Sequence, residues 1–578
     1  MASSQVKDLS IERKPSFFHK FLPILGWLPS YKKSWLSTDL LAGLAVWALA
    51  VPQAMAYAGI AGVPAVYGLY ALPLALIAYA IFGTSHTLGL GPDSALAMLS
   101  AATVGALAAQ GSEEFLALSF ALALMVGLLF IIFGLLRLGW VAHFLANPVL
   151  KGFMQGLALV VLVGQLPKIF GVEGASGNFF QELWAIIVQL PQANLVTMII
   201  GFSSLSLLFA FRHILPRAPG ALIAVVLAIF AVSIFDLTAY GVDVVGVIET
   251  SLPPLGLPDV SLGDLAALVP GALALVLVGY SKSLGMAKTA SETTREKIDT
   301  NQEMIALGIS NASSGFSSGI AVGGSMSRTT TVIGAGGRTQ LTALVNAFLV
   351  ILTLLFLMPF FENLPQATLG AIVIYAMIRM LDFGYFKRLY RISRPEFWYA
   401  SAAFLGELFL GTLPGVLMGV ILSLLVLIRR VTRPGTAVIG RMPDETYRDV
   451  NRYPEAETVP GLLIFRFDSV LFFSNADYFT DEVQKYIDRA KVPVQQVLVN
   501  SETINDLDTT GTDRLIKLHE DLKRDNIQLA FAEVKDPVRE MMRLSGAEEA
   551  IGEENFYSSV SAGVRAFLAR EQGGTYSS

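Results

Sequence analysis

The sequence has no cysteine among its 578 residues, which excludes disulfides, thiol catalysis and thiolate metal sites. Charge is also scarce, because only 15% of the residues are Asp, Glu, Lys or Arg, against about 25% in an average soluble protein. The net charge of −5 argues against a nucleic-acid-binding protein. No cleavable signal peptide is recognisable, and no pair of histidines has metal-ligand spacing. We therefore expect no metal or other cofactor.

The longest charge-free stretch is residues 40–92, which contain no Asp, Glu, Lys or Arg. A spanning helix needs about 20 residues, so this stretch could cross a bilayer twice. It also contains several prolines and glycines, together with Gln53 and Tyr57. Proline and glycine are tolerated at membrane depth where the freed backbone is buried or lines a cavity. The stretch therefore predicts a membrane passage built around a binding site.

Charge is concentrated at the other end of the chain, where residues 429–578 carry 44 of the 87 charged residues. Apolar segments recur through the preceding part, and hydropathy alone predicts about twelve to fourteen passes. We expect a cytoplasmic N-terminal segment at residues 1–36, a transmembrane domain at 37–430 and a soluble domain at 437–572.

The loops predict the orientation through their Lys and Arg content. The N-terminal segment, residues 288–297 and residues 387–394 are basic, whereas residues 237–270 contain no Lys or Arg. We therefore predict that the three basic segments are cytoplasmic and that residues 237–270 are external. Both termini are then cytoplasmic, which requires an even number of passes through the plasma (inner) membrane.

The two halves of the membrane region resemble each other weakly. Residues 88–99 and 321–336 are both glycine-rich breaks followed by a short apolar segment. Paired short segments in corresponding halves are typical of a transporter binding site at the membrane midplane. The alternative is that both are glycine-rich surface loops.

Several motifs together resemble the SulP anion transporters, the family of the sulfate permeases and prestin. The first is PAVYGLYALPLALIAYAIFGTSH (Pro64 to His86), in which His86 replaces the usual Lys or Arg. The others are PQAMAYA (Pro52 to Ala58), NQEMIALGISNASSGFSSG (Asn301 to Gly319), GGSMSRTT (Gly323 to Thr330) and LPQATLGAIV (Leu364 to Val373). The resemblance implies fourteen transmembrane helices in a 7+7 inverted repeat. It also implies two half-helices with facing N-termini, a mobile core domain, a static gate domain and a homodimer.

The last quarter alternates strand-like and helical segments and resembles the STAS domain, a small cytoplasmic α/β module. Residues 461–467, 494–500 and 526–534 are strand-like, and residues 475–489 and 512–523 have helical periodicity. In soluble relatives of this domain a Ser following an Asp is phosphorylated. Thr509 takes that position here and is a regulatory candidate. The alternative is a helix cap and turn.

Arg328 leads the candidates for substrate binding, because a cation within a spanning segment is costly and marks function by default. With Ser327 it matches the Ser-Arg pair at the anion site of animal members of the family, although it could instead snorkel or pair with a carboxylate. Gln53 and Tyr57, one turn apart, lie on a helix that lines the family's site, unless they only pack. Ser94, at the start of the first short segment, completes this group.

Lys282 departs from the family pattern, since relatives carry Asp or Glu at this position and the bicarbonate carriers use the Asp for sodium. A Lys cannot ligate sodium, but it could replace the sodium charge or bind substrate directly. Alternatively, it pairs with Asp93 or Glu407. These two acids are candidates for a coupling proton, although Asp93 could simply cap a helix and Glu407 could be structural.

The resemblance implies a secondary transporter and not an enzyme. We expect it to move a small oxyanion, sulfate first and then dicarboxylate or bicarbonate, by an elevator-like movement with proton coupling. The expected partners are the anion, the bilayer and a second copy of the chain, without nucleic acid. Two alternatives remain: a nucleobase permease of the same architecture, and a membrane-anchored STAS signalling protein without transport.

Overall fold

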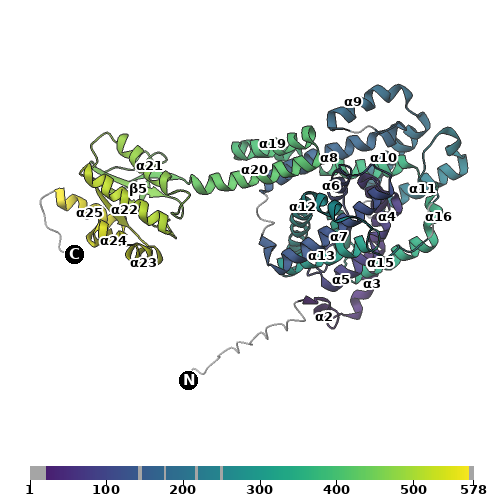
Figure 1. The fold of residues 1–578 in the computed structure, drawn as a ribbon, viewed down its shortest axis with the longest axis horizontal. Coiled ribbons are helices and arrows are strands. Elements are labelled where there is room, and N and C mark those ends of the chain that lie inside the picture. Colours follow the sequence, from purple (N-terminus) through teal and green to yellow (C-terminus); the bar gives the residue numbers. More distant parts are fainter. Residues whose placement is uncertain (1–20, 141–145, 175–176, 215–218, 248–250, 572–578) are drawn as a thin grey trace, which may run out of the picture. The chain divides into compact units, whose positions relative to one another are not determined.

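The computed structural model describes residues 21–140, 146–174, 177–214, 219–247 and 251–571. The chain divides into two compact units, Met1–Ser423 and Leu424–Ser578 (Figure 1). The division falls within helix α20 (Thr412–Thr432). Most of the expected N-terminal segment, residues 1–36, lies outside the described residues.

The first unit is helical throughout, apart from two short strands. Among the described residues, nine helical spans are long and apolar enough to cross a membrane. They are formed by α3 (Leu36–Ala61), α4 with α5 (Ala65–Tyr70, Pro73–Phe82), α7 (Glu113–Leu135), α8 (Asn147–Phe170), α10 (Leu195–Ile214), α12 (Leu262–Thr294), α15 with α16 (Leu341–Leu352, Met358–Phe361), α17 with α18 (Gln366–Met380, Phe383–Ile392) and α20. The shorter helices are α6 (Ser94–Val104), α9 (Phe179–Gln189), α11 (Gly220–Phe235), α13 (Thr300–Phe316), α14 (Met326–Gly334) and α19 (Arg394–Leu410). The helical membrane region is thus confirmed, while the number fourteen stays a prediction.

Helix ends follow local sequence signals. Ser261 begins α12 with a capping box, in which its hydroxyl and the Asp264 carboxylate satisfy each other's backbone N–H groups. Gly62 ends α3 in the left-handed conformation, at φ 82°. Hydropathy marks only residues 269–278 of the 33-residue α12, because its later turns carry many polar side chains.

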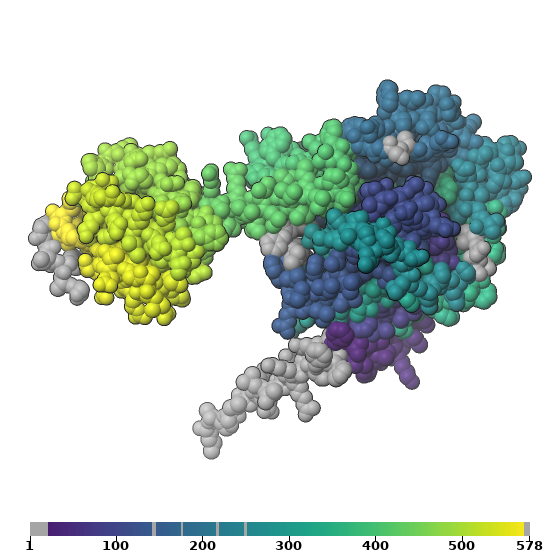
Figure 2. Space-filling view, viewed as in Figure 1, coloured from purple at the N-terminus to yellow at the C-terminus, as the bar shows by residue number. Residues whose placement is uncertain are grey.

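The two halves of the membrane unit are intertwined. Helix α7 packs along α13, α3 along α15, and α5 against both α13 and α15. The space-filling view shows the blue segment that contains α7 beside the teal segment that contains α12 (Figure 2). Glu303 of α13 ties these halves together, since its carboxylate accepts hydrogen bonds from the Tyr79 hydroxyl and from the Thr84 N–H and hydroxyl.

The second unit is a six-stranded sheet with helices on both faces. The strand order is β4-β3-β5-β6-β7-β8, with β5 to β8 parallel and β3 antiparallel to both its neighbours. The strands are β3 (Thr436–Arg441), β4 (Tyr447–Asp449), β5 (Leu462–Phe467), β6 (Gln496–Asn500), β7 (Gln528–Ala532) and β8 (Phe556–Tyr557).

Alternate residues of β5 enter two different cores, as strand geometry requires. Phe465 and Phe467 pack under α21 (Ala476–Asp488), α22 (Thr509–Arg524), α23 (Asp536–Leu544) and α24 (Ala547–Ile551). Leu462 and Ile464 pack under α25 (Val560–Glu571) on the other face. A sheet covered by helices is what the sequence predicts for this region.

Candidate functional site

The two glycine-rich breaks form one structural feature. Strand β1 (Leu90–Pro92) pairs antiparallel with β2 (Val322–Gly324), and Gly91 lies opposite Gly323. Helix α6 follows β1, and α14 follows β2. Because the strands are antiparallel, the two helices start at opposite ends of the ribbon, about 10 Å apart. Each N-terminus offers unpaired N–H groups and partial positive charge, which suits an anion.

Neighbouring helices hold this ribbon through side-chain hydrogen bonds. Asn311 of α13 donates to Val322 O and accepts from Val322 N, both at 2.9 Å. Ser283 of α12 accepts from Gly324 N at 2.8 Å, and the Thr329 hydroxyl accepts from Gly89 N at 3.0 Å. Strand edges inside a membrane protein need such partners, since no water is there to supply them.

Arg328, in the first turn of α14, is completely buried. None of its three guanidinium nitrogens has a hydrogen-bond partner among the described residues. Glycines make room for the side chain, because a Cβ at Gly89 or Gly91 would collide with Arg328 atoms. Arg328 thus neither snorkels nor pairs with a carboxylate. Because its donors are buried and have no acceptor, Arg328 is the strongest candidate in this region for binding an anion.

Polar groups of α3 lie close to this arginine. The Gln53 amide donates to the Ser327 hydroxyl at 3.4 Å, and Ser327 lies 3.1 Å from the Ser325 hydroxyl. The Gln53 carbonyl oxygen is buried without a partner. Tyr57 is buried on the same helix, near enough to Asp93 and Arg328 to interact electrostatically with both.

Lys282 forms an ion pair with Asp93, one of the alternatives that the sequence left open. Asp93 is also the N-cap of α6, where its carboxylate accepts from Ala95 N at 3.1 Å. Ser94 follows it as a buried residue in the first turn. Both side chains of the ion pair are largely buried, with 14% and 8% of their surface exposed. The opposite charges of this ion pair cancel, so the net charge of the site is the positive charge of Arg328.

Two of the sequence candidates lie elsewhere. Glu407 of α19 is buried against Gly156 of α8 and Gly415 of α20, with one oxygen accepting from Thr412 at 2.8 Å and the other unpaired. Thr509 is an exposed residue in the first turn of α22, whose N-cap is Asp508. The Asp508 carboxylate accepts hydrogen bonds from Gly511 N at 2.7 Å and from Phe473 N at 2.9 Å. These bonds are those expected if the segment around Thr509 is a helix cap and turn.

The sequence reading missed the residues that support the ribbon, above all Asn311 and Ser283. A signal for Asn311 was present, because an amide in a helix of the membrane region needs a hydrogen-bond partner where it is buried. The reading also missed Glu303, the buried carboxylate between the two halves.

Comparison with known proteins gives consistent matches along the chain. Residues 36–403 match the model of the sulfate permease family, and residues 453–563 match that of the STAS domain. Probable sulfate transporter MT1781 of Mycobacterium tuberculosis (strain CDC 1551 / Oshkosh) is 37% identical over 94% of this chain and 99% of its own length. Sulfate transporter 4.1, chloroplastic, of Arabidopsis thaliana is 31% identical over 94% of this chain and 82% of its own length.

Solved structures of two transporters share the fold. The murine Slc26a9 anion transporter in the inward-facing state has a TM-score of 0.87 at 26% identity, covering 97% of this chain and 96% of that one. The transmembrane domain of the cyanobacterial bicarbonate transporter BicA has a TM-score of 0.60 at 26% identity, covering 68% of this chain and 98% of that one. The chain therefore belongs to the sulfate permease family, whose members are membrane anion transporters and not enzymes, and it carries a C-terminal STAS domain.

Proposed function

We propose that this chain is a secondary transporter that moves a small oxyanion through the site at Arg328. Sulfate is the first candidate, followed by dicarboxylates and bicarbonate. The observation that carries the proposal is the completely buried Arg328 guanidinium, which has no hydrogen-bond partner among the described residues and lies in the first turn of α14, beside the β1–β2 ribbon. The names of the relatives as sulfate transporters support sulfate over the other anions.

The chemistry of the site suits a tetrahedral oxyanion. A guanidinium offers parallel N–H donors that match two oxygens of one anion. The N-termini of α6 and α14, with the hydroxyls of Ser94 and Ser327, supply further donors around it. Gln53 and Tyr57 would close the site from α3. Lys282 contributes the donors of its ammonium that Asp93 leaves free.

We propose that Asp93 carries the coupling proton. With Asp93 ionised, Arg328, Lys282 and Asp93 sum to one positive charge. Protonation of Asp93 raises that sum to two, which matches a dianion such as sulfate. A proton and a dianion would therefore bind together and be transported together. Sodium is disfavoured, because the Lys282 ammonium repels a cation at this position.

An elevator-like movement fits the distribution of the site residues. All of them belong to α3, α6, α12, α14 and the β1–β2 ribbon. Helices α8, α10, α11, α17 and α19 contribute none of them, and they pack largely against one another. The helices that hold the site residues would move together past α8, α10, α11, α17 and α19 and carry the complete site with them. This movement would take place within a homodimer whose termini both face the cytoplasm.

The test is uptake by purified protein in proteoliposomes with labelled sulfate, bicarbonate, succinate and uracil in parallel. We expect saturable uptake of sulfate, competed by succinate or bicarbonate and not by uracil. Uracil uptake would favour a nucleobase permease, and no uptake of any solute would favour the signalling alternative.

A further inference from the structure

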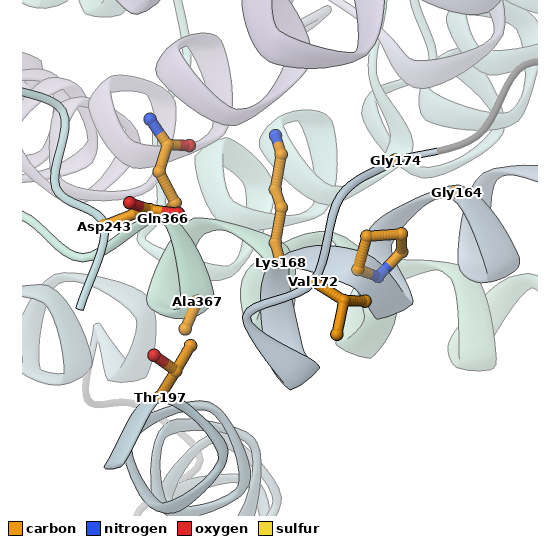
Figure 3. A pocket seen from close by; sticks show the side chains of 9 residues that line it. Gly164, Lys168, Val172, Gly174, Thr197, Asp243, Gln366 and Ala367 are labelled. Carbon is orange, nitrogen blue, oxygen red and sulfur yellow. The ribbon is translucent and has the colours of Figure 1, made fainter. Parts of the chain in front are cut away.

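A cavity of about 280 Å³ lies apart from Arg328, at the end of the membrane unit that the loop charges assign to the external side. It is formed where α8 ends and where α10 and α17 begin (Figure 3). The residues lining it are Gly164, Pro167, Lys168, Val172, Gly174, Thr197, Asp243, Gln366 and Ala367. No site residue discussed above is among them.

Lys168 gives this cavity its chemistry. It is the only cationic lining residue, and among the described residues its ammonium has no hydrogen-bond or ion-pair partner. Figure 3 shows its extended side chain beside Gln366 and Asp243. Thr197 lies on the far side of Ala367, away from the ammonium. An unpaired cation at a cavity is a donor without an acceptor.

The carboxylates nearby do not cancel this cation. Asp243 is exposed at the rim, where water screens its charge. Glu182 of α9 lies behind Gly164, with no ion-pair partner of its own among the described residues. Neither approaches Lys168 within ion-pair distance, whereas Lys168 is half-buried in a less polar environment, where its field reaches further. The Lys168 ammonium at this cavity is therefore not neutralised by direct pairing with either carboxylate.

The cavity also lies close to the path toward the central site. The Lys168 ammonium reaches Gly59 of α3, since a Cβ there would lie 2.9 Å from Nζ. Gln53, on the same helix, is six residues away, which is about 9 Å along the helix axis. An anion held by Lys168 is thus about two turns of α3 from the central site.

We propose that this cavity is an outer anion-binding site, in which Lys168 captures the transported oxyanion before it reaches Arg328. The inference rests on the proposed function, because it takes the same small oxyanion as ligand. The Gln366 amide is placed to donate to the same ion.

The test compares initial sulfate uptake into right-side-out and inside-out membrane vesicles that contain the full chain. Lys168→Gln should raise the external KM about tenfold, the lower end of what electrostatic focusing supplies. The KM at the inner face should stay unchanged. Lys168→Arg should restore most of the external affinity, and Asp243→Asn should lower the external KM. An unchanged external KM in Lys168→Gln, or an equal rise at both faces, would overturn the proposal.

Lys151→Gln is the matched control, since it removes the same charge from the other end of α8. It should leave the external KM unchanged, and a rise equal to that of Lys168→Gln would count against a local site. Calorimetry with sulfate on purified Arg328→Ala protein separates the two proposals. Weak sulfate binding should persist in Arg328→Ala and vanish in the Arg328→Ala, Lys168→Gln double variant. If Arg328→Ala binds no sulfate at all, the proposal of an outer site is wrong, whichever anion the wild type transports.

Discussion

At the scale of single residues, the site is defined by which charges have partners. Lys282 and Asp93 satisfy each other, and Arg328 is left without a partner. Removing one partner of a buried ion pair costs about 3–5 kcal/mol, because the other charge stays buried and unpaired. The pair therefore stabilises the structure, whether or not Asp93 also carries the proposed coupling proton.

The first prediction concerns sodium. Because the Lys282 ammonium repels a second cation in a poorly hydrated site, wild-type uptake should be the same in sodium and in choline medium. The measurement is the initial rate against external sodium at fixed pH and membrane potential. A saturable sodium requirement would show that a sodium ion binds elsewhere.

The second prediction separates the two candidate acids. Proton coupling predicts that wild-type uptake declines as pH rises. Asp93→Asn fixes this position in a neutral form like that of the protonated acid, so its uptake should not show this decline. Glu407→Gln is the matched comparison, and it should keep the wild-type profile because Glu407 packs among α8, α19 and α20. Initial rates across a pH series decide between them. The opposite pattern would move the coupling proton to Glu407.

At the scale of elements, the β1–β2 ribbon positions both helix N-termini and the arginine. The glycine-rich breaks were readable in the sequence because glycine marks unusual backbone. Their antiparallel pairing was not, since it joins residues more than 200 positions apart and is held by Asn311 and Ser283 from two other helices. The partner of Lys282 stayed open for the same reason: sequence spacing cannot choose between Asp93 and Glu407.

The third prediction tests the close approach at this ribbon. Gly91 has φ 151°, and a Cβ there would collide with Arg328 Nη1 and lie 2.8 Å from Leu72 Cδ2. Gly91→Ala should therefore displace the guanidinium, abolish tight sulfate binding at the Arg328 site and cost about 1–3 kcal/mol of stability. Binding and thermal unfolding of purified protein measure both effects.

Gly334→Ala serves as its control, because a Cβ at the end of α14 meets no atom within 4 Å. It should bind sulfate normally. Normal binding by Gly91→Ala as well would mean that Arg328 does not need this packing.

At the scale of the whole molecule, the two units have separate cores and separate tasks. The change in charge density near residue 430 made the two-part organisation readable. The alternating strands and helices of the second unit predicted its central strands β5, β6 and β7. Strand β3 and the two edge strands, β4 and β8, escaped prediction, because each is short or gains its partner only when the sheet is assembled.

The fourth prediction follows from this separation. Deletion of residues 435–578 should leave a membrane unit that inserts and binds sulfate with unchanged affinity, since every proposed site residue lies upstream. Its transport rate or expression should fall, as expected if the STAS domain is regulatory, with Thr509 as a candidate position. Sulfate binding and uptake by the purified truncation are the measurements. Loss of binding in a well-folded truncation would assign part of the site to the second unit.

The central claim is that Arg328 holds the transported oxyanion. Its most direct test is labelled sulfate uptake by proteoliposomes that contain wild type, Arg328→Ala or the exposed control Arg338→Ala, each first shown to have the same oligomeric size in detergent. We predict saturable uptake by wild type and Arg338→Ala, and none above protein-free liposomes for Arg328→Ala. Sulfate uptake by Arg328→Ala with the wild-type KM would contradict the claim.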